Sequence, residues 1–399
     1  MARWGEGRAN GTVAKDLLRI LHVGKYYPPY VGGTEIYTRD LVQWQVKSAS
    51  VTVIVSNDTT ATSYESVNEA RVIRVPRFGV IASMPVTPTL PVHIRRVPAD
   101  IVHLHMPNPA AALSYLLSGH RGQLILTHHA DTVGRRFLRS ITDPIVKEVM
   151  ARACRIIVTT KSYLDTSGEL ADYADKCRVI PLGVDPGTFA SVPEDEVQAI
   201  RSKYGTRLLL CIGRLVEYKG FEFAIRALGS LEARLLIVGN GRLQSHLHQV
   251  ARDCGVADRV HFLGSLPNER IPALLKAATI LLFPSTRRTE SFGYVQLEAM
   301  ASGLPVINTA IKSGASEVSL DGITGFTVPA KDSEALAAAA QKLLHDTNLR
   351  QRFGEAGIRR VNEYYTLDRM CKLTSDLYQE VLDDRLNLRE PYTLSYSQG

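Results

Sequence analysis

The stretch LLLCIGRLVEYKGFEFAIRALGSL, from Leu208 to Leu231, contains the pattern that decides the fold. It begins with an apolar run, Leu208–Ile212, of the kind that forms a strand buried on both faces of a sheet. A loop with a glycine at each end, 213–220, comes next, and a helix-length segment follows it. A strand, a loop and a helix in this order are half of a βαβ unit, so the stretch indicates a parallel sheet covered by helices.

The same alternation continues on both sides of this stretch. We therefore predict an α/β protein with two Rossmann-like, doubly wound domains that face a central crevice, where the carboxyl ends of the strands place ligands. Helix-length segments include 34–47, 109–119, 243–254 and 292–301. The expected strands are 17–23, 51–55, 101–104, 124–127, 156–159 and 179–181 in the first half, and 208–212, 235–238, 260–263, 280–283 and 305–308 in the second.

The pattern pauses at PLGVDP, residues 181–186, so the two halves divide near 185–200. The expected division is a flexible N-terminus (1–15), a first domain (16–188), a second domain (189–370) and a C-terminal helix with a tail (371–399). Ser191 can cap the helix that follows the pause, and the acids Glu194, Asp195 and Glu196 suit the dipole of its first turn. A metal-binding acidic cluster is the less favoured alternative.

Composition excludes several classes of protein. Of 399 residues, 45% are hydrophobic and 22% are charged, which excludes a disordered or fibrous chain. The 47 Lys and Arg against 40 Asp and Glu suit phosphates or an anionic membrane, and fall short of the basic footprint of a nucleic-acid binder. The five cysteines are scattered, and neither a signal peptide nor a membrane-spanning run is visible, so we expect a cytoplasmic protein.

Four loops that leave strands carry the candidate chemistry. In the first, Gly32 and Gly33 precede a helix and can let amide groups approach an anion, although a plain turn explains them equally well. In the second, Arg214 and Lys219 can clamp a diphosphate, the alternative being two solvated cations. The chain has neither GxGxxG nor a Walker motif, which disfavours a dehydrogenase and an ATPase.

The third loop leads from Glu290 to Glu298. On a helix that begins near Ser291, Glu298 lies two turns beyond Glu290 and on roughly the same side. Such carboxylates can accept hydrogen bonds from sugar hydroxyls or act as an acid/base pair. The alternative is one capping and one surface glutamate, but the apolar neighbours of Glu298 disfavour a solvated face.

The fourth loop follows a strand that ends in Thr127-His128-His129, with Asp131 two residues on. A metal site needs further ligands that the spacing does not provide. In the preceding strand, His103 and His105 point to the same side. His105 therefore either faces the crevice or is a hydrogen-bonded core histidine.

Taken together, these motifs resemble the retaining glycosyltransferases of family 4, which have the GT-B fold. The resemblance covers the chain from about Ile20 to the helices near Asp384. Its E-x7-E signature corresponds to Glu290 and Glu298, its GR…KG clamp to Gly213-Arg214 and Lys219-Gly220, and its glycine-rich loop to Gly32-Gly33.

The resemblance implies roles for these positions. Arg214 and Lys219, with the amide of Gly33, would bind the donor diphosphate and stabilise it as it leaves. Glu290 would hold hydroxyls of the donor sugar, and Glu298 those of the ribose. His129 matches the histidine beside the donor sugar better than His128 does. Further donor contacts would come from Gly32, Gly213, Gly239, Asn240, Leu263, Phe292, Gly293 and Tyr294.

The resemblance also implies a reaction without a metal, a cofactor or a protein nucleophile, and a last helix that crosses back to the first domain. The donor would be a UDP- or GDP-sugar, and the acceptor a glycan or polyprenyl-diphosphate-linked oligosaccharide in surface polysaccharide or lipopolysaccharide assembly. Nucleic acid is not an expected partner. An epimerase or phosphorylase on the same fold and a non-catalytic nucleotide-sugar-binding protein remain the alternatives.

The acceptor side is predicted from charge. Between 71 and 98 there are five arginines and no acid, and three more arginines follow in 135–139. We predict that this surface meets an anionic membrane or a lipid-diphosphate acceptor, against the alternative of scattered solvated side chains. The acceptor-side candidates are His105, Asp131, Arg135 and Arg136.

Overall fold

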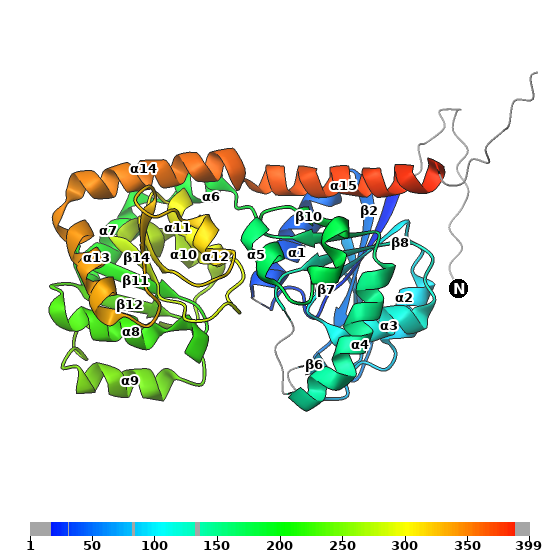
Figure 1. Ribbon diagram of the computed structural model, residues 1–399, viewed down its shortest axis with the longest axis horizontal. Helices are drawn as coiled ribbons and strands as arrows, with labels where there is room; N and C mark the ends of the chain where they lie inside the picture. Colours follow the sequence, from blue (N-terminus) through cyan, green and yellow to red (C-terminus); the bar gives the residue numbers. More distant parts are fainter. Residues whose placement is uncertain (1–16, 31, 82–83, 132–135, 388–399) are drawn as a thin grey trace, which may run out of the picture.

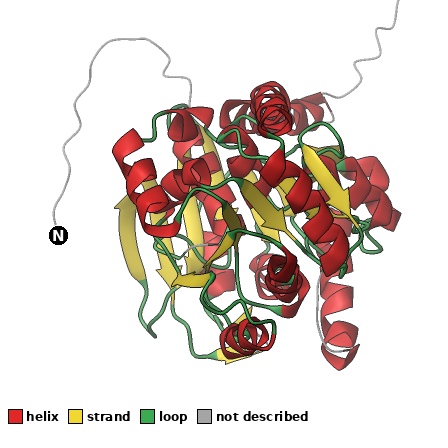
Figure 2. Ribbon diagram, turned by 90° about the vertical axis from the view of Figure 1, so that its left-hand side faces the viewer, coloured by secondary structure: helices red, strands yellow, loops and turns green. Residues whose placement is uncertain are grey.

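The computed structural model describes residues 17–30, 32–81, 84–131 and 136–387. It contains two parallel sheets, each covered by helices, and so confirms the predicted fold class (Figures 1 and 2). None of the helices in the described ranges is both long enough and apolar enough to cross a bilayer.

The first sheet has the strand order β10-β9-β8-β7-β1-β2-β4-β3. All neighbours are parallel except the exposed edge strand β3, which pairs antiparallel with β4. The sequence analysis missed both β3 and β4. A small hairpin, β5 and β6, accompanies the sheet. The strands are β1 Leu18–Val23, β2 Ala49–Ser56, β3 Ser63–Val67, β4 Ala70–Val75, β5 Val80–Ile81, β6 Met84–Pro85, β7 Ile101–Met106, β8 Gln123–His128, β9 Arg155–Val158 and β10 Cys177–Val179, and the helices are α1 Gly33–Gln45, α2 Leu90–Arg96, α3 Pro109–Ser118, α4 Arg136–Arg152 and α5 Lys161–Thr166.

The second sheet has the order β13-β12-β11-β14-β15-β16 and is parallel throughout. Its order reverses between β11 and β14, which makes the loops after these two strands the expected ligand position. The strands are β11 Leu208–Ile212, β12 Arg234–Val238, β13 Val260–Gly264, β14 Ile280–Phe283, β15 Val306–Thr309 and β16 Gly325–Val328, and the helices are α6 Pro186–Ala190, α7 Glu194–Tyr204, α8 Phe221–Ala227, α9 Gln244–Asp253, α10 Ile271–Ala277, α11 Tyr294–Ala301, α12 Ala315–Val318, α13 Ser333–His345, α14 Thr347–Tyr364 and α15 Leu367–Asn387.

The pause between the two halves contains two helices rather than one. Ser191 does not cap α7, because its hydroxyl donates to the carbonyl of Gly187 and closes α6. Pro193 precedes α7 and offers no side-chain cap. The three acids Glu194, Asp195 and Glu196 do occupy the first turn of α7, as their sequence suggested.

The chain passes between the domains twice, and the two crossings pair with each other. Val184 in the first crossing forms a parallel bridge with Thr366 in the second. The amide of Val184 donates to Tyr365 over 2.9 Å, and the amide of Leu367 donates to Val184 over 2.8 Å. Helix α15 then runs along the first domain (Figure 1).

Ion pairs and packing hold α15 on the first domain. Arg155 of β9 lies 2.7 Å from Glu380 and 2.9 Å from Asp384. The helix begins at Leu367, four residues before the start that we had placed at 371. It therefore belongs to the first domain in space, although it ends the second in sequence.

Candidate active site

Two residues from different motifs meet where the second sheet reverses. The ammonium of Lys219, after β11, lies 2.5 Å from Oε2 of Glu290, after β14. Ser285 also donates to this oxygen, over 3.3 Å. Only 13% of the Lys219 side chain and 11% of the Glu290 side chain are exposed, so the ion pair is largely shielded from water. The topology thus brings together the two groups that the sequence placed in separate loops.

Close backbone packing lets Lys219 reach this position. A Cβ on Gly213 would lie 3.2 Å from Cε of Lys219, so the side chain passes directly over the glycine. A Cβ on Gly239 would lie 2.0 Å from the carbonyl oxygen of Gly213, which excludes any larger residue there. Asn240 follows at the exposed end of β12, and the partly buried Leu263 lies in the adjacent β13.

Arg214 and Lys219 both interact with Tyr218. The Arg214 guanidinium donates to the hydroxyl of Tyr218 over 3.2 Å, and the Lys219 ammonium lies 5.7 Å from the centre of its ring. Arg214 is exposed and also acts electrostatically on Glu35 of the first domain. The two cations can therefore act on one anion in the gap between the domains.

Glu298 lies on α11, whereas Glu290 lies in the loop before it. The helix begins at Tyr294 and not near Ser291, so the two carboxylates are not on one helix face as expected. Burial, and then the nearby Asp40, raise the pKa of Glu298 to about 7, against the opposing effect of Arg39. Part of the Glu298 side chain still meets solvent. Its neighbours Asp40 and Arg39 come from α1, so this carboxylate faces the first domain.

The side chains of Phe292 and Tyr294 are engaged within the protein. Phe292 is 3% exposed and packs in the core. The Tyr294 hydroxyl donates over 3.0 Å to the carbonyl of Gly183, in the first crossing between the domains. Gly293 precedes α11 in a left-handed conformation, with φ 78°.

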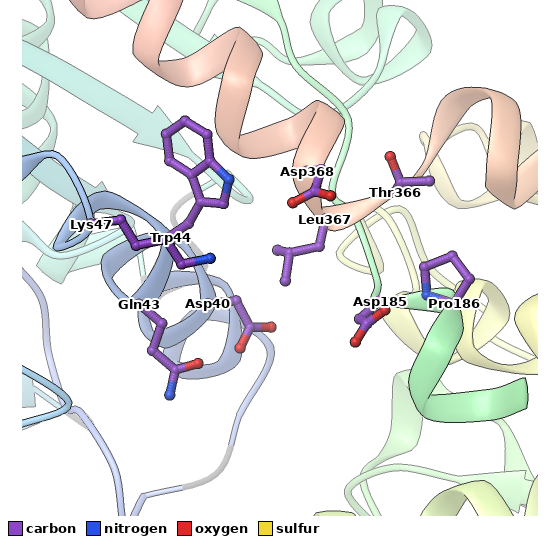
Figure 3. A pocket seen from close by; sticks show the side chains of 9 residues that line it. All are labelled: Asp40, Gln43, Trp44, Lys47, Asp185, Pro186, Thr366, Leu367 and Asp368. Carbon is purple, nitrogen blue, oxygen red and sulfur yellow. The ribbon is translucent and has the colours of Figure 1, made fainter. Parts of the chain in front are cut away.

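A cavity of about 510 Å³ lies where the two crossings meet α1 (Figure 3). Asp40 and Trp44 line it from α1, Asp185 from the start of α6, and Leu367 and Asp368 from the start of α15. Asp40 also acts on Glu298, so it joins this cavity to the candidate site electrostatically.

The predicted histidines of the first domain are buried. His129 is 9% exposed, and its Nε2 has no hydrogen-bond partner in the described part of the chain. Burial, followed by the nearby His128, lowers the pKa of His129 to about 3, so the ring is neutral at physiological pH. His105 is 2% exposed and stacks at 5.9 Å on His129. His105 is thus buried and hydrogen-bonded, as in the second of its two alternatives, while its Nδ1 has no hydrogen-bond partner within the described residues. Its place on the acceptor side stays a prediction.

His105 belongs to a buried polar network that the sequence analysis did not foresee. Its Nε2 lies 3.1 Å from Nδ1 of His22, and Nε2 of His22 lies 2.7 Å from Gln45 of α1. His103 bonds to Tyr378 of α15 over 2.5 Å and to Thr127 over 2.6 Å. The alternation His103-Leu104-His105 in β7 was the available signal, but one partner, Tyr378 of α15, is 275 residues away in sequence.

Asp131 accepts hydrogen bonds from residues of both domains. It accepts hydrogen bonds from Tyr163 over 3.1 Å, from Ser167, and from Arg288 of the second domain. A third potential ligand group does lie beside His128 and Asp131, namely Glu169. His128 bonds to Tyr163 and Glu169, however, and the guanidinium of Arg288 already neutralises Asp131.

The arginine surface divides into two groups. Arg71 lies over the ring of Tyr64, Arg74 pairs with Glu65, and Arg77 pairs with Asp58 over 2.8 Å, so these three hold the first domain together. Arg95 and Arg96 on α2 are exposed and form no ion pair within the described residues. Arg135 lies outside the described residues, and Arg136 begins α4 without a described side chain.

Comparison with known families follows the same two halves. Residues 31–188 match the model of "Glycosyltransferase Family 4", and residues 193–360 match that of "Glycosyl transferases group 1". The loops that carry Gly32, Gly33, Arg214, Lys219, Glu290 and Glu298 all lie inside the matched regions.

Individual relatives extend over most of the chain. D-rhamnosyltransferase WbpZ of Pseudomonas aeruginosa is 31% identical over 67% of this chain and 70% of its own. O-antigen chain mannosyltransferase C of Escherichia coli is 28% identical over 92% and 100%. A GDP-mannose-dependent alpha-(1-6)-phosphatidylinositol monomannoside mannosyltransferase of Mycolicibacterium smegmatis is 30% identical over 85% and 92%. Among solved structures, sucrose-phosphate synthase of Thermosynechococcus elongatus has a TM-score of 0.77 at 21% identity, over 92% of this chain and 100% of its own.

Proposed function

Because the chain belongs to glycosyltransferase family 4 and has the GT-B fold, we propose that it transfers a sugar, with retention, from a GDP- or UDP-linked donor to a hydroxyl of a glycan or lipid-linked oligosaccharide. The observation that carries this proposal is the meeting of Lys219 and Glu290 beside Arg214, at the reversal of the second sheet.

In this proposal, Arg214 and Lys219 bind the donor diphosphate from the second domain, and the amide of Gly33 binds it from the first. Charge-assisted contacts to phosphate oxygens are strong, and they strengthen as negative charge develops on the leaving group. The Lys219–Glu290 pair then has a second use. Glu290 orients the ammonium toward the diphosphate and accepts hydrogen bonds from hydroxyls of the donor sugar.

The rest of the donor lies along the second domain. Glu298 accepts hydrogen bonds from the ribose, Gly239, Asn240 and Leu263 lie near the base, and Gly213 lies under Lys219 beside the diphosphate. The backbone groups of Phe292, Gly293 and Tyr294 lie beside the sugar. His129 offers a neutral imidazole on the opposite side, so it can exchange a hydrogen bond with a sugar hydroxyl without bringing a charge next to the reacting carbon.

The reaction needs no protein nucleophile in this proposal. The acceptor hydroxyl attacks the anomeric carbon on the face from which the diphosphate departs. The bond from that carbon to the phosphate oxygen breaks, the bond to the acceptor oxygen forms, and the acceptor proton moves to the leaving phosphate. The positive side chains of Arg214 and Lys219 stabilise the charge of the leaving group.

The relatives favour a GDP-linked donor and a surface glycan as acceptor. One relative is GDP-mannose-dependent by name, and another is named an O-antigen chain mannosyltransferase. We propose that the protein acts at the cytoplasmic face of a membrane and contacts anionic lipid through Arg95 and Arg96, since these two arginines have no acidic partner within the described residues.

A thermal-shift panel of GDP- and UDP-sugars, followed by product analysis, tests the proposal. A donor present at about 100 times its dissociation constant should stabilise the fold by about 2.7 kcal/mol. Transfer to an added glycan, with the anomeric configuration kept, is the expected product. Release of an altered sugar without an acceptor would instead show an epimerase, and binding without turnover would show a non-catalytic protein.

A further inference from the structure

The carboxylate of Glu35 is folded back over the first turn of α1. Glu35 is the third residue of this helix, whose N-cap is Gly32. A Cβ on Gly32 would lie only 2.3 Å from Oε2 of Glu35. The carboxylate also accepts a hydrogen bond from its own backbone amide. It therefore occupies the N-terminal end of a 13-residue helix, where free amides and the helix dipole attract an anion.

Two positive side chains, one from each domain, act on this carboxylate. Burial raises the pKa of the Glu35 carboxyl, and Lys25, in the loop between β1 and α1, and Arg214 of the second domain both act to lower it. Glu35 acts on Lys25 in return, and Arg214 acts on Lys25 with the opposite sign. Arg214 and the amide of Gly33 are the groups that we assign to the donor diphosphate. The carboxylate thus lies among the groups that would bind a phosphate.

A glutamate at this helix position often completes a capping box, which is sufficient to stabilise the first turn. A capping box alone does not explain why Lys25 and Arg214, an arginine of the other domain, both act on Glu35. Without an anion, Lys25 and Arg214 act on each other as like charges and repel. A single carboxylate relieves this repulsion until a stronger anion arrives.

We propose that Glu35 is an internal competitor of the donor, whose carboxylate holds the phosphate position in the free protein and leaves it when the donor diphosphate binds. This inference rests on the proposed function. A diphosphate brings more charge and more acceptor oxygens than one carboxylate, so it can displace Glu35. An anion with a single charge gains little from the exchange, so Glu35 sets a threshold that favours diphosphates over other cellular anions.

The inference predicts the sign of a mutation. Glu35→Gln keeps the size of the side chain and removes its charge, so inorganic pyrophosphate and GDP should bind about tenfold more tightly than to the unmodified protein. A residue that merely stabilises the helix or the binding loop would give weaker binding on substitution. Isothermal titration calorimetry with both probes measures the difference.

Two further variants complete the test. Glu65→Gln removes a carboxylate of the same domain that pairs with Arg74 on the edge of the sheet, and should leave the affinity unchanged. The gain from Glu35→Gln should shrink when Arg214 is also replaced by alanine, because the two side chains act on each other.

The outcomes separate this inference from the proposed function. Tighter binding in Glu35→Gln supports the competitor. Equal or weaker binding in Glu35→Gln and in Glu35→Ser, with both folded by circular dichroism, would overturn it while leaving the proposed function intact if the unmodified protein binds GDP. Absence of binding to all these proteins would overturn both.

Discussion

The two domains place polar side chains at equivalent positions, the carboxyl ends of parallel strands, with opposite results. In the second domain, Lys219 and Glu290 follow β11 and β14 and meet at the crevice. In the first domain, His22 lies near the end of β1 and His103 lies opposite it within β7, yet they turn inward and bond to α1 and α15. The difference is that helices pack over these histidines in the first domain. Side chains that could have bound a ligand therefore become part of the core.

The largest expected effect is in the second domain. Lys219→Ala removes a charge-assisted contact to the leaving group and leaves Glu290 unpaired, so kcat/KM should fall by about 10²- to 10³-fold. Initial rates of sugar transfer measure the loss. Glu194→Ala, on the exposed first turn of α7, is the matched control and should keep full activity. Substantial activity in Lys219→Ala would contradict the diphosphate assignment.

As the pH falls, the first domain should lose stability before the second. Burial lowers the pKa of His22 to about 4 and that of His129 to about 3, and lowers those of His103 and His105 well below the usual value. Because these pKa values lie below the unfolded value of about 6.5, the stability they provide is present above pH 6.5 and is lost as the pH falls. At pH 5 one such histidine should cost about 2 kcal/mol.

Glu298 of the second domain acts in the opposite direction, since its pKa is raised to about 7. Burial also raises the pKa values of Glu35 and Asp40 on α1, which offsets part of the effect of the four histidines in the first domain. Hydrogen exchange pulsed at a fixed labelling pH, after incubation between pH 7.5 and 5, should show β1 and β7 losing protection before β11 and β12. His246→Gln, at an exposed position of α9, should leave this profile unchanged. Equal loss of protection in both sheets would contradict the contrast between the domains.

The smallest expected effect is at the surface of the first domain. Reversing Arg95 and Arg96 to glutamate should weaken binding to anionic vesicles by tenfold or more, at about 1 kcal/mol for each basic side chain near the membrane. Co-sedimentation with phosphatidylserine vesicles measures this. The same reversal at Arg226, an exposed arginine of α8 in the second domain, is the control. Equal binding of vesicles by all variants would contradict the proposed contact of Arg95 and Arg96 with the membrane.

Much of the fold could be predicted because the strands are apolar runs that differ sharply from their surroundings. The exposed edge strand β3 was missed since its residues lack such a run. In the second domain the motif loops also predicted which residues would gather, because the reversal of strand order brings the ends of β11 and β14 together.

The first domain was harder to predict because its partners are distant in sequence. His103 and Tyr378 are 275 residues apart, and Asp131 and Arg288 are 157 apart. The same limit applies to Arg74 and Arg77, whose charges suggested a membrane surface but are neutralised by Glu65 and Asp58. Local sequence shows that a charge exists, and only the folded chain shows what neutralises it.

The pairing of the two crossings, at Val184 and Thr366, restricts how the domains can move. A single connecting strand would permit bending, twisting and translation, whereas two strands joined by backbone hydrogen bonds leave the domains less freedom to move. Donor entry, the release of Glu35 and the approach of Gly33 to Arg214 would then all depend on this one doubled connection.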